Sequence, residues 1–165
     1  IQVEKLYQKA IEFAKLSNDD VVLDAYCGIG TIALSLAKYV KKVYGVEIVD
    51  TAINDARNNA KLNKIENVEF KCDDAGKYMI ELVNNNIHLD VVFVDPPRKG
   101  CSKEFLDYLI QAKPSKIIYI SCDVATQARD IKYLQEFNYQ VDMCQPVDMF
   151  PHTTHIENIV RLKYK

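Results

Sequence analysis

Several features that mark large classes of protein are missing from this sequence. No apolar run approaches the roughly eighteen residues that a membrane-spanning helix needs, so we expect no membrane role. The five cysteines form an odd set without a CxxC pair, which argues against a disulfide framework or a zinc ribbon and favours reduced thiols in the cytoplasm. An excess of positive charge is also missing, since the net charge is -2, so any nucleic-acid partner must be argued from other features.

The size and composition that are present fit one domain. The 165 residues are enough to bury a core, and 48% hydrophobic with 27% charged residues is ordinary for a globular protein. We expect one domain over residues 1–165, and a monomer. Because the chain starts at Ile1 and at once shows the amphipathic helix pattern "VEKLYQKAIEFAKL", we also expect it to be the carboxyl-terminal part of a longer protein.

Short β-branched runs alternate with helical patterns along most of the chain. Strands are predicted at 21–26, 42–47, 67–72, 89–95 and 116–121, and helices at 31–39, 51–63, 75–84 and 103–112. This alternation favours a parallel sheet with helices on both faces.

After a further helix near 125–137, strand candidates at 139–150 and 156–164 are separated only by "PHTTH". Two strands with so short a link pair antiparallel. The whole is the Rossmann-like α/β plan of class I S-adenosylmethionine-dependent methyltransferases, with seven mostly parallel strands and a final antiparallel hairpin.

In open sheets of this kind the ligand lies beyond the carboxyl ends of the strands, so residues there are candidates for a site. The first strand leaves through "LDAYCGIGTIAL", where Gly28 and Gly30 allow close backbone approach. Glu47 ends the next strand, where a carboxylate can hold ribose hydroxyls. The missing third glycine of the dinucleotide fingerprint favours S-adenosylmethionine over NAD. A tight turn with a surface glutamate would explain the same residues without a ligand.

Further candidates follow the third and fourth strands. Asp74, just after the third strand, is assigned to the cofactor site. Asp95 opens "DPPRKG", in which two prolines stop the strand abruptly and leave a rigid turn, although a plain strand terminator is the alternative. His152 and His155 lack a recognisable third and fourth ligand, so no metal site is predicted.

Cys122 stands where the fifth strand ends and a helix begins, a position that favours a thiolate. Free cysteines usually behave as small buried hydrophobes, and the other four are assigned to that role. Glu157 is charged at the start of the apolar strand "IENIV". It is either exposed at the sheet edge or turned into the cleft, and the residues leave both open.

Five segments occur in a fixed order: "LDAYCGIGTIAL", "GVE", "VDPPRKG", "YISCDVATQARD" and "DMFPHTTHIE". In this order they resemble the catalytic domain of the RNA uracil-5-methyltransferases, which use S-adenosylmethionine to make 5-methyluridine in ribosomal or transfer RNA. The resemblance implies Tyr26, Glu47 and Asp95 as cofactor contacts, Cys122 as the nucleophile that adds to C6 of uracil, and Glu157 as the base that removes the C5 proton. It also implies an RNA substrate, ribosomal RNA ahead of transfer RNA, with an amino-terminal RNA-binding β-barrel outside these residues.

The sequence departs from the family pattern directly after Cys122. The family usually has Asn and then Pro there, whereas this chain has Asp123 and Val124. Two other functions remain open on the residues alone. An amino-group methyltransferase also carries an acidic residue before Pro-Pro but needs no thiol, and a degenerate fold of this type can serve as a non-catalytic cofactor-binding or RNA-binding module.

Overall fold

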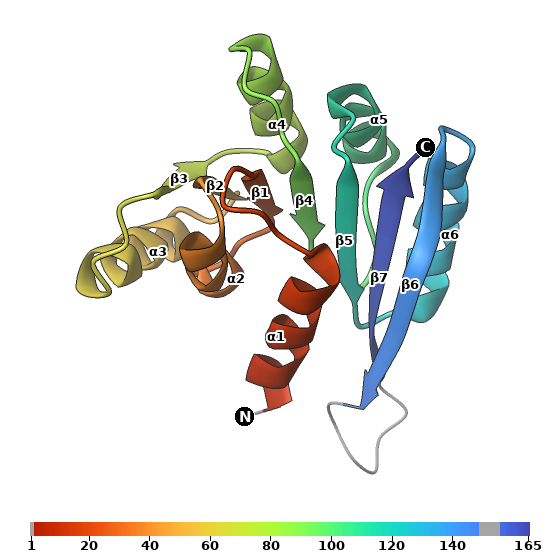
Figure 1. Ribbon diagram of the computed structural model, residues 1–165, viewed down its shortest axis with the longest axis horizontal. Coiled ribbons are helices and arrows are strands. Elements are labelled where there is room, and N and C mark those ends of the chain that lie inside the picture. The colour runs from red at the N-terminus through yellow and green to blue at the C-terminus, as the bar shows by residue number, and fades with distance from the viewer. Residues whose placement is uncertain (1, 149–155) are drawn as a thin grey trace.

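In the computed structural model, which describes residues 2–148 and 156–165, a seven-stranded sheet lies between two layers of helices (Figure 1). The strands are β1 (Val21–Ala25), β2 (Lys42–Glu47), β3 (Val68–Cys72), β4 (Val91–Val94), β5 (Lys116–Ser121), β6 (Tyr139–Asp148) and β7 (Ile156–Tyr164). They lie in the order β3-β2-β1-β4-β5-β7-β6, and β1 to β5 are parallel. The last two strands are antiparallel, as predicted.

The helices follow the predicted pattern closely. They are α1 (Gln2–Ala14), α2 (Thr31–Leu36), α3 (Asp50–Leu62), α4 (Ala75–Asn84), α5 (Lys103–Ala112) and α6 (Val124–Gln135). The helix predicted at 31–39 was wrong in one respect, because its last turn is the 3₁₀ helix η1 (Ala37–Tyr39). A 3₁₀ turn tightens a helix end, and here it leads to the extended Val40 shortly before β2.

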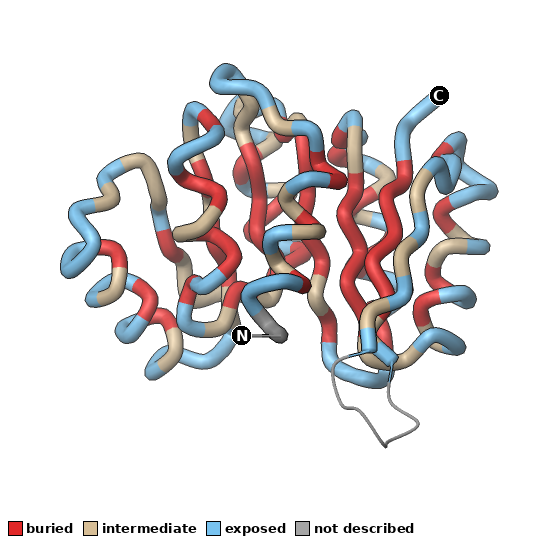
Figure 2. The backbone as a smooth tube through the Cα atoms, turned by 60° about the horizontal axis from the view of Figure 1, so that its bottom comes forward, coloured by how far each residue is buried: buried red, intermediate tan, exposed pale blue. Residues whose placement is uncertain are grey.

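Two apolar layers hold the helices on the sheet. On one face, α1, α2 and α3 pack against alternate residues of the central strands, among them Phe93, Ile118 and Ile159. On the other face, α4, α5 and α6 pack against the intervening residues, such as Val92, Tyr119 and Val160. Buried residues therefore run along the central strands without the polar alternation of a one-sided sheet (Figure 2).

The hairpin of β6 and β7 closes the sheet on one side. β7 is paired on both sides, whereas β6 forms the outer edge, is mostly exposed and carries a register shift between Val141 and Met143. Within the described residues, no helix is both long enough and apolar enough to cross a bilayer.

Candidate active site

The strand order brings the predicted site residues to one edge of the sheet. Because β1 lies between β2 and β4, the chain reverses its direction of winding there, which is the position where open α/β sheets bind ligands. The edge carries all eight predicted residues, which lie in the spatial order Asp74, Glu47, the loop of Tyr26, Gly28 and Gly30, Asp95, Cys122 and Glu157. Glu157 joins them because β7 is antiparallel, so its start lies where β5 ends.

The loop after β1 is shaped by its glycines and by Glu47. Gly28 has a φ of +52°, and apart from its chain neighbours no residue has an atom within 4 Å of the place that a Cβ would occupy. Glu47 accepts hydrogen bonds from the Gly28 amide (3.2 Å) and from the amides of Ile48 and Val49 (2.9 and 3.1 Å). Gly30 precedes α2 and packs against Phe70. The loop is therefore held in place from β2, with an open side above Gly28.

Tyr26 occupies an unusual backbone conformation at the end of β1. Its φ is +63°, in the left-handed region that bulky residues rarely adopt, and such strain concentrates at functional sites. The ring packs on the α4 to α6 face of the sheet, with its centroid 5.3 Å from that of Phe105. Its side chain thus supports the loop from the opposite face to Asp24 and Asp95.

Asp24 is a buried carboxyl group that the sequence analysis did not assign to the site. It is fully buried in β1 and accepts a hydrogen bond through Oδ2 from the Ala33 amide of α2 (2.9 Å), while Oδ1 has no partner within the described residues. Burial raises the pKa of Asp24 well above its usual range, and the charges of Asp95 and Glu47 raise it further. This orphaned oxygen points to an unfilled contact beside the glycine loop.

Asp74 has a different environment. It is exposed, and its side chain accepts a hydrogen bond from the Lys77 amide (3.0 Å) as the N-cap of α4. Asp74 therefore has a structural role that the sequence analysis did not consider, and its cofactor role stays a prediction.

Asp95 ends β4 within a cluster of acidic groups on the α1 face of the sheet. Burial raises the pKa of Asp95 to about 7, and the nearby charge of Glu157 contributes. Burial also raises the pKa of Glu157, an effect that the Arg98 guanidinium opposes. The pKa of Tyr7, on α1, is raised to about 12 by burial and by Asp95, Asp24 and Glu157. We call Asp24, Asp95 and Glu157 the carboxylate cluster; Tyr7 of α1 lies within range of the charges of all three.

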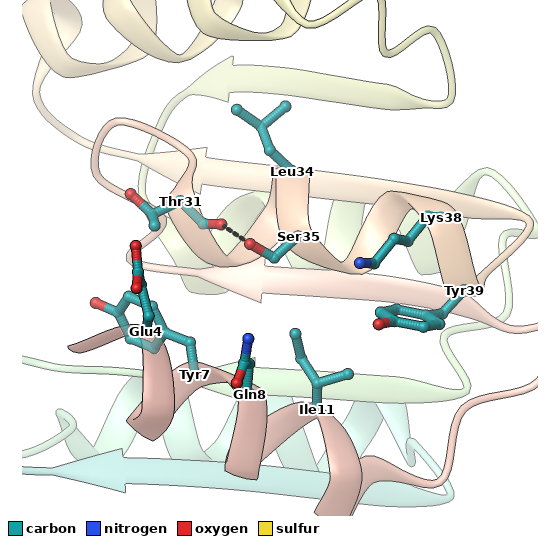
Figure 3. A pocket seen from close by; sticks show the side chains of 9 residues that line it. All are labelled: Glu4, Tyr7, Gln8, Ile11, Thr31, Leu34, Ser35, Lys38 and Tyr39. Carbon is teal, nitrogen blue, oxygen red and sulfur yellow. Dashed lines mark hydrogen bonds between the residues drawn. The ribbon is translucent and has the colours of Figure 1, made fainter. Parts of the chain in front are cut away.

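A groove of about 250 Å³ opens beside this cluster, between α1 and the pair formed by α2 and η1 (Figure 3). Glu4, Tyr7, Gln8 and Ile11 line it from α1, and Thr31, Leu34 and Ser35 line it from α2. Ser35 donates a hydrogen bond to the Thr31 carbonyl (2.8 Å), so its hydroxyl is already engaged within the helix. Tyr7 belongs to both the groove and the surroundings of the carboxylate cluster.

Cys122 and Glu157 are brought together by the register of β5 and β7. The last bridged pair is Ser121 with Asn158, and extending the register by one step sets Cys122 opposite Glu157. Both positions fall on the α1 face, because side chains alternate along a strand and the pair two steps away, Ile120 and Ile159, packs there. Cys122 is half-buried and directly precedes α6, whose N-cap is Asp123.

The loop after β4 is fastened to α6. Asp130 is buried and accepts hydrogen bonds from the Cys101 amide (2.8 Å) and the Tyr119 hydroxyl (2.7 Å). Arg129 pairs with Asp130 and donates to the carbonyls of Lys99 and Cys101. Thr126 donates to the Arg98 carbonyl (3.0 Å), so the backbone of Arg98 is held close to the start of α6.

Three residues at this edge were missed by the sequence analysis: Asp24, Tyr7 and Arg98. The position of Asp24 at the end of the first strand was a usable signal. Tyr7 and Arg98 gave none, because their relation to Asp95 and Glu157 depends on contacts between distant segments. Among the described residues no group of three or more His, Cys, Asp or Glu side chains could hold a metal ion, and His152 and His155 lie outside them.

Two solved structures with this arrangement are methyltransferases by name. A tRNA (uracil-54, C5)-methyltransferase of Pyrococcus abyssi, solved in complex with S-adenosyl-L-homocysteine, superposes with a TM-score of 0.81 at 34% identity and covers 96% of this chain and 37% of its own. An rRNA methylase of Streptococcus thermophilus superposes with a TM-score of 0.74 over 100% of this chain and 98% of its own, and at 15% identity it shows the fold alone. The fold is that of the class I S-adenosylmethionine-dependent methyltransferases, as predicted.

Sequence comparison defines the family within that class. The model of the tRNA (Uracil-5-)-methyltransferase family matches residues 2–165, and the chain belongs to this family. Proteins named "Uncharacterized RNA methyltransferase" from Clostridium tetani and Listeria innocua are each 51% identical to it, over 99% and 100% of the chain. The chain spans 36% of the length of both relatives.

Proposed function

We propose that the protein containing these residues methylates C5 of a uridine in RNA with S-adenosylmethionine, using Cys122 as nucleophile and Glu157 as base. The observation that supports this most is the register of β5 and β7, which sets a thiol and a carboxyl group opposite each other at the edge where the fold binds ligands. We propose Tyr26, Gly28, Gly30, Glu47, Asp74 and Asp95 as the cofactor contacts.

The residues present fit such a cofactor. The open side of Gly28 leaves room for close approach, and the orphaned Oδ1 of Asp24 is an unfilled polar contact beside it. Glu47 accepts three backbone hydrogen bonds, and a carboxylate has about four acceptor positions, so one remains for a ribose hydroxyl. S-adenosylmethionine would supply the methyl group as an electrophile.

The two catalytic residues answer two separate requirements of the reaction. C5 of uracil is a weak nucleophile, and addition of the Cys122 thiolate to C6 makes C5 enolate-like. Once C5 carries the methyl group, its remaining proton is acidic, and Glu157 takes that proton while the thiolate leaves C6. Burial raises the pKa of Glu157, which makes its carboxylate a stronger base than an exposed one. The target uridine must leave its base stack to reach both groups, and we propose ribosomal RNA ahead of transfer RNA as its source.

Cys122→Ser tests the nucleophile in the full-length protein. With RNA that contains 5-fluorouridine, the fluorine cannot leave as a proton does, so the wild type should form a covalent protein–RNA adduct that maps to Cys122 by mass spectrometry. We expect Cys122→Ser to abolish the adduct and lower methylation by about 1,000-fold or more, with cofactor affinity kept. Cys72→Ser, which changes a half-buried thiol at the end of β3, is the matched control and should form the adduct normally.

The other outcomes point to the two alternatives. Unchanged methylation by Cys122→Ser with no adduct in the wild type would support amino-group methylation. Failure of the full-length wild type to bind S-adenosylmethionine would support a non-catalytic module. Ribosomal and transfer RNA transcripts, tested side by side, identify the substrate.

A further inference from the structure

A layer of buried polar side chains lies directly behind Cys122 and Glu157. Ser121, Gln127 and Asn158 are 2%, 1% and 7% exposed, and they lie on the α6 face of the sheet, where the other buried residues, apart from Asp130, are apolar. Burying polar groups costs free energy unless each one is hydrogen-bonded. We call these three residues the polar layer; their presence in an apolar interface calls for an explanation beyond packing.

Gln127 joins α6 to both strands that carry the proposed catalytic residues. Its Nε2 donates to the carbonyls of Tyr119 on β5 (3.0 Å) and Asn158 on β7 (3.2 Å). Its Oε1 accepts from Nδ2 of Asn158 (2.7 Å). Every polar atom of the Gln127 side chain is thus directed at β5 or β7, and hydrogen bonds fix direction in a way that apolar contacts do not.

Ser121 fixes the turn that contains Cys122. Its hydroxyl donates to the Asp123 carbonyl and accepts from the Asp123 amide, both at 3.0 Å, so the two residues that flank Cys122 are tied to each other. Asp123 in turn caps α6 by accepting from the Thr126 amide (2.9 Å). The backbone at Cys122 is therefore held from both sides.

The polar layer and the proposed catalytic pair are arranged back to back. Ser121 and Asn158 are paired across β5 and β7 and face α6, while Cys122 and Glu157 occupy the next register position and face α1. Asn158 also accepts a hydrogen bond from Cys144 of β6 (3.4 Å), which fixes the start of β7 from its other side. Any rotation or sliding of one strand end against the other would break these bonds.

We propose that Ser121, Gln127 and Asn158 act as a positioning unit that sets the orientation of Cys122 relative to Glu157. This inference rests on the proposed function, since it assigns a role in that same reaction. The three residues touch neither substrate nor cofactor in this role. They act through the backbone of their neighbours, and an error of about 1 Å in the placement of reacting groups can lower a rate about 100-fold.

The test compares two variants that each lose buried hydrogen bonds in the full-length protein. Gln127→Met keeps the length and volume of the side chain and removes its hydrogen bonds. Tyr139→Phe is the matched control. It removes the buried hydrogen bond from Tyr139 to the Pro114 carbonyl (3.0 Å), which lies at the other end of β5 from Cys122. The readouts are the single-turnover rate of adduct formation with 5-fluorouridine RNA, the dissociation constant of S-adenosylmethionine, and the Tm.

We expect Gln127→Met to slow adduct formation about 10- to 100-fold while cofactor affinity stays within about twofold of wild type. Tyr139→Phe should lower the Tm comparably and leave the rate within about twofold. Ser121→Ala, which deletes a single oxygen, should slow the same step, and it keeps the test available if Gln127→Met does not fold. If the residues act as one unit, the variant that combines Gln127→Met with Ser121→Ala should lose about as much rate as the slower of the two single variants.

Two results would overturn the inference. One is a wild-type rate of adduct formation in both Gln127→Met and Ser121→Ala with only the Tm lowered. The other is an equal loss of rate in Tyr139→Phe, which would mean that the rate follows stability. Both results are judged against a wild-type protein that forms the adduct. If the proposed function itself is wrong, the wild type forms no adduct.

Discussion

Asp95 is a single residue of the proposed site whose ionisation lowers the stability of the folded chain. Asp95 is half-buried, and burial together with the charge of Glu157 raises its pKa to about 7. Between about pH 4 and pH 7 the folded state therefore binds more protons at Asp95 than the unfolded state does, so this group destabilises the folded chain increasingly as the pH rises through that window. Functional sites commonly keep such unfavourable groups.

Asp95→Asn tests this linkage. The amide has nearly the same shape and cannot ionise, so we expect its Tm to exceed that of wild type by about 3 °C at pH 8, with the difference shrinking toward zero at pH 4.5. Asp55→Asn, on the exposed side of α3, is the matched control and should show no such dependence. Differential scanning calorimetry across this range is the measurement, and an equal gain at both pH values would contradict the explanation. Methylation should fall in Asp95→Asn, since Asp95 is also a proposed cofactor contact.

The residues of the site were predictable to different degrees. Cys122, Glu47 and Asp95 stand at strand ends that composition and turn residues reveal, so their shared edge followed from the alternation of strands and helices. The relation of Glu157 to Cys122 could not be predicted from the residues alone, because it depends on which strands are neighbours and on their register. Gln127 and Asn158 gave no signal, since they meet across 31 positions of sequence.

At the scale of elements, the start of α6 explains the departure from the family pattern after Cys122. Asp123 is the N-cap and Val124 is the first helical residue. Asn and Asp are about equally good at an N-cap, and Pro is favoured at the first helical position because no intrahelical bond is lost there. Asp-Val and Asn-Pro are therefore two solutions to one requirement, which is to begin a helix directly after the thiol.

The double substitution Asp123→Asn with Val124→Pro should consequently leave the free energy of unfolding within about 0.5 kcal/mol of wild type. Asp123→Ala, which removes the cap, should cost about 1 kcal/mol. Urea denaturation followed by circular dichroism measures both. A loss of more than about 1 kcal/mol in the double variant would show that Asp123 or Val124 has a further role in the folded chain.

At the scale of the whole molecule, Arg161 links the first helix to the last strands. Its buried side chain donates to the Phe13 carbonyl of α1 and forms a two-pronged pair with Asp142 of β6. The hydrogen bonds from Arg161 and Lys163 lower the pKa of Asp142 to about 2. The stability from this pair is present above the ordinary pKa of an aspartate and is lost as the pH falls toward about 2.

Arg161→Met should lower the free energy of unfolding at pH 7 by about 2 kcal/mol, because it leaves Asp142 with only Lys163 and frees the end of α1. Hydrogen exchange should rise in α1 more than in α4, which packs on the opposite face of the sheet. Lys163→Met is the matched control: its exposed ion pair with Asp142 should contribute less than about 1 kcal/mol. Equal losses in the two variants would contradict the importance of the α1 contact.

The overall architecture was the most predictable level. Alternating strands and helices indicated the parallel sheet, and the short link before residue 156 indicated the final hairpin. The break of the predicted 31–39 helix into α2 and η1 depends on where the chain must turn toward β2, which local propensity does not encode.

The pairing of β5 with β7 has a consequence for how this protein can diversify. Side chains alternate between the two faces of a strand, so replacing a residue in β7 changes the chemistry at that position and leaves the direction of Glu157 intact. Deleting or inserting one residue in β7 after Asn158 would shift the register by one position. Glu157 would then face α6, and Asn158 would face the cleft. The site therefore tolerates substitutions in β7 but not insertions or deletions. We expect homologues that methylate uridine to align through β7 without gaps.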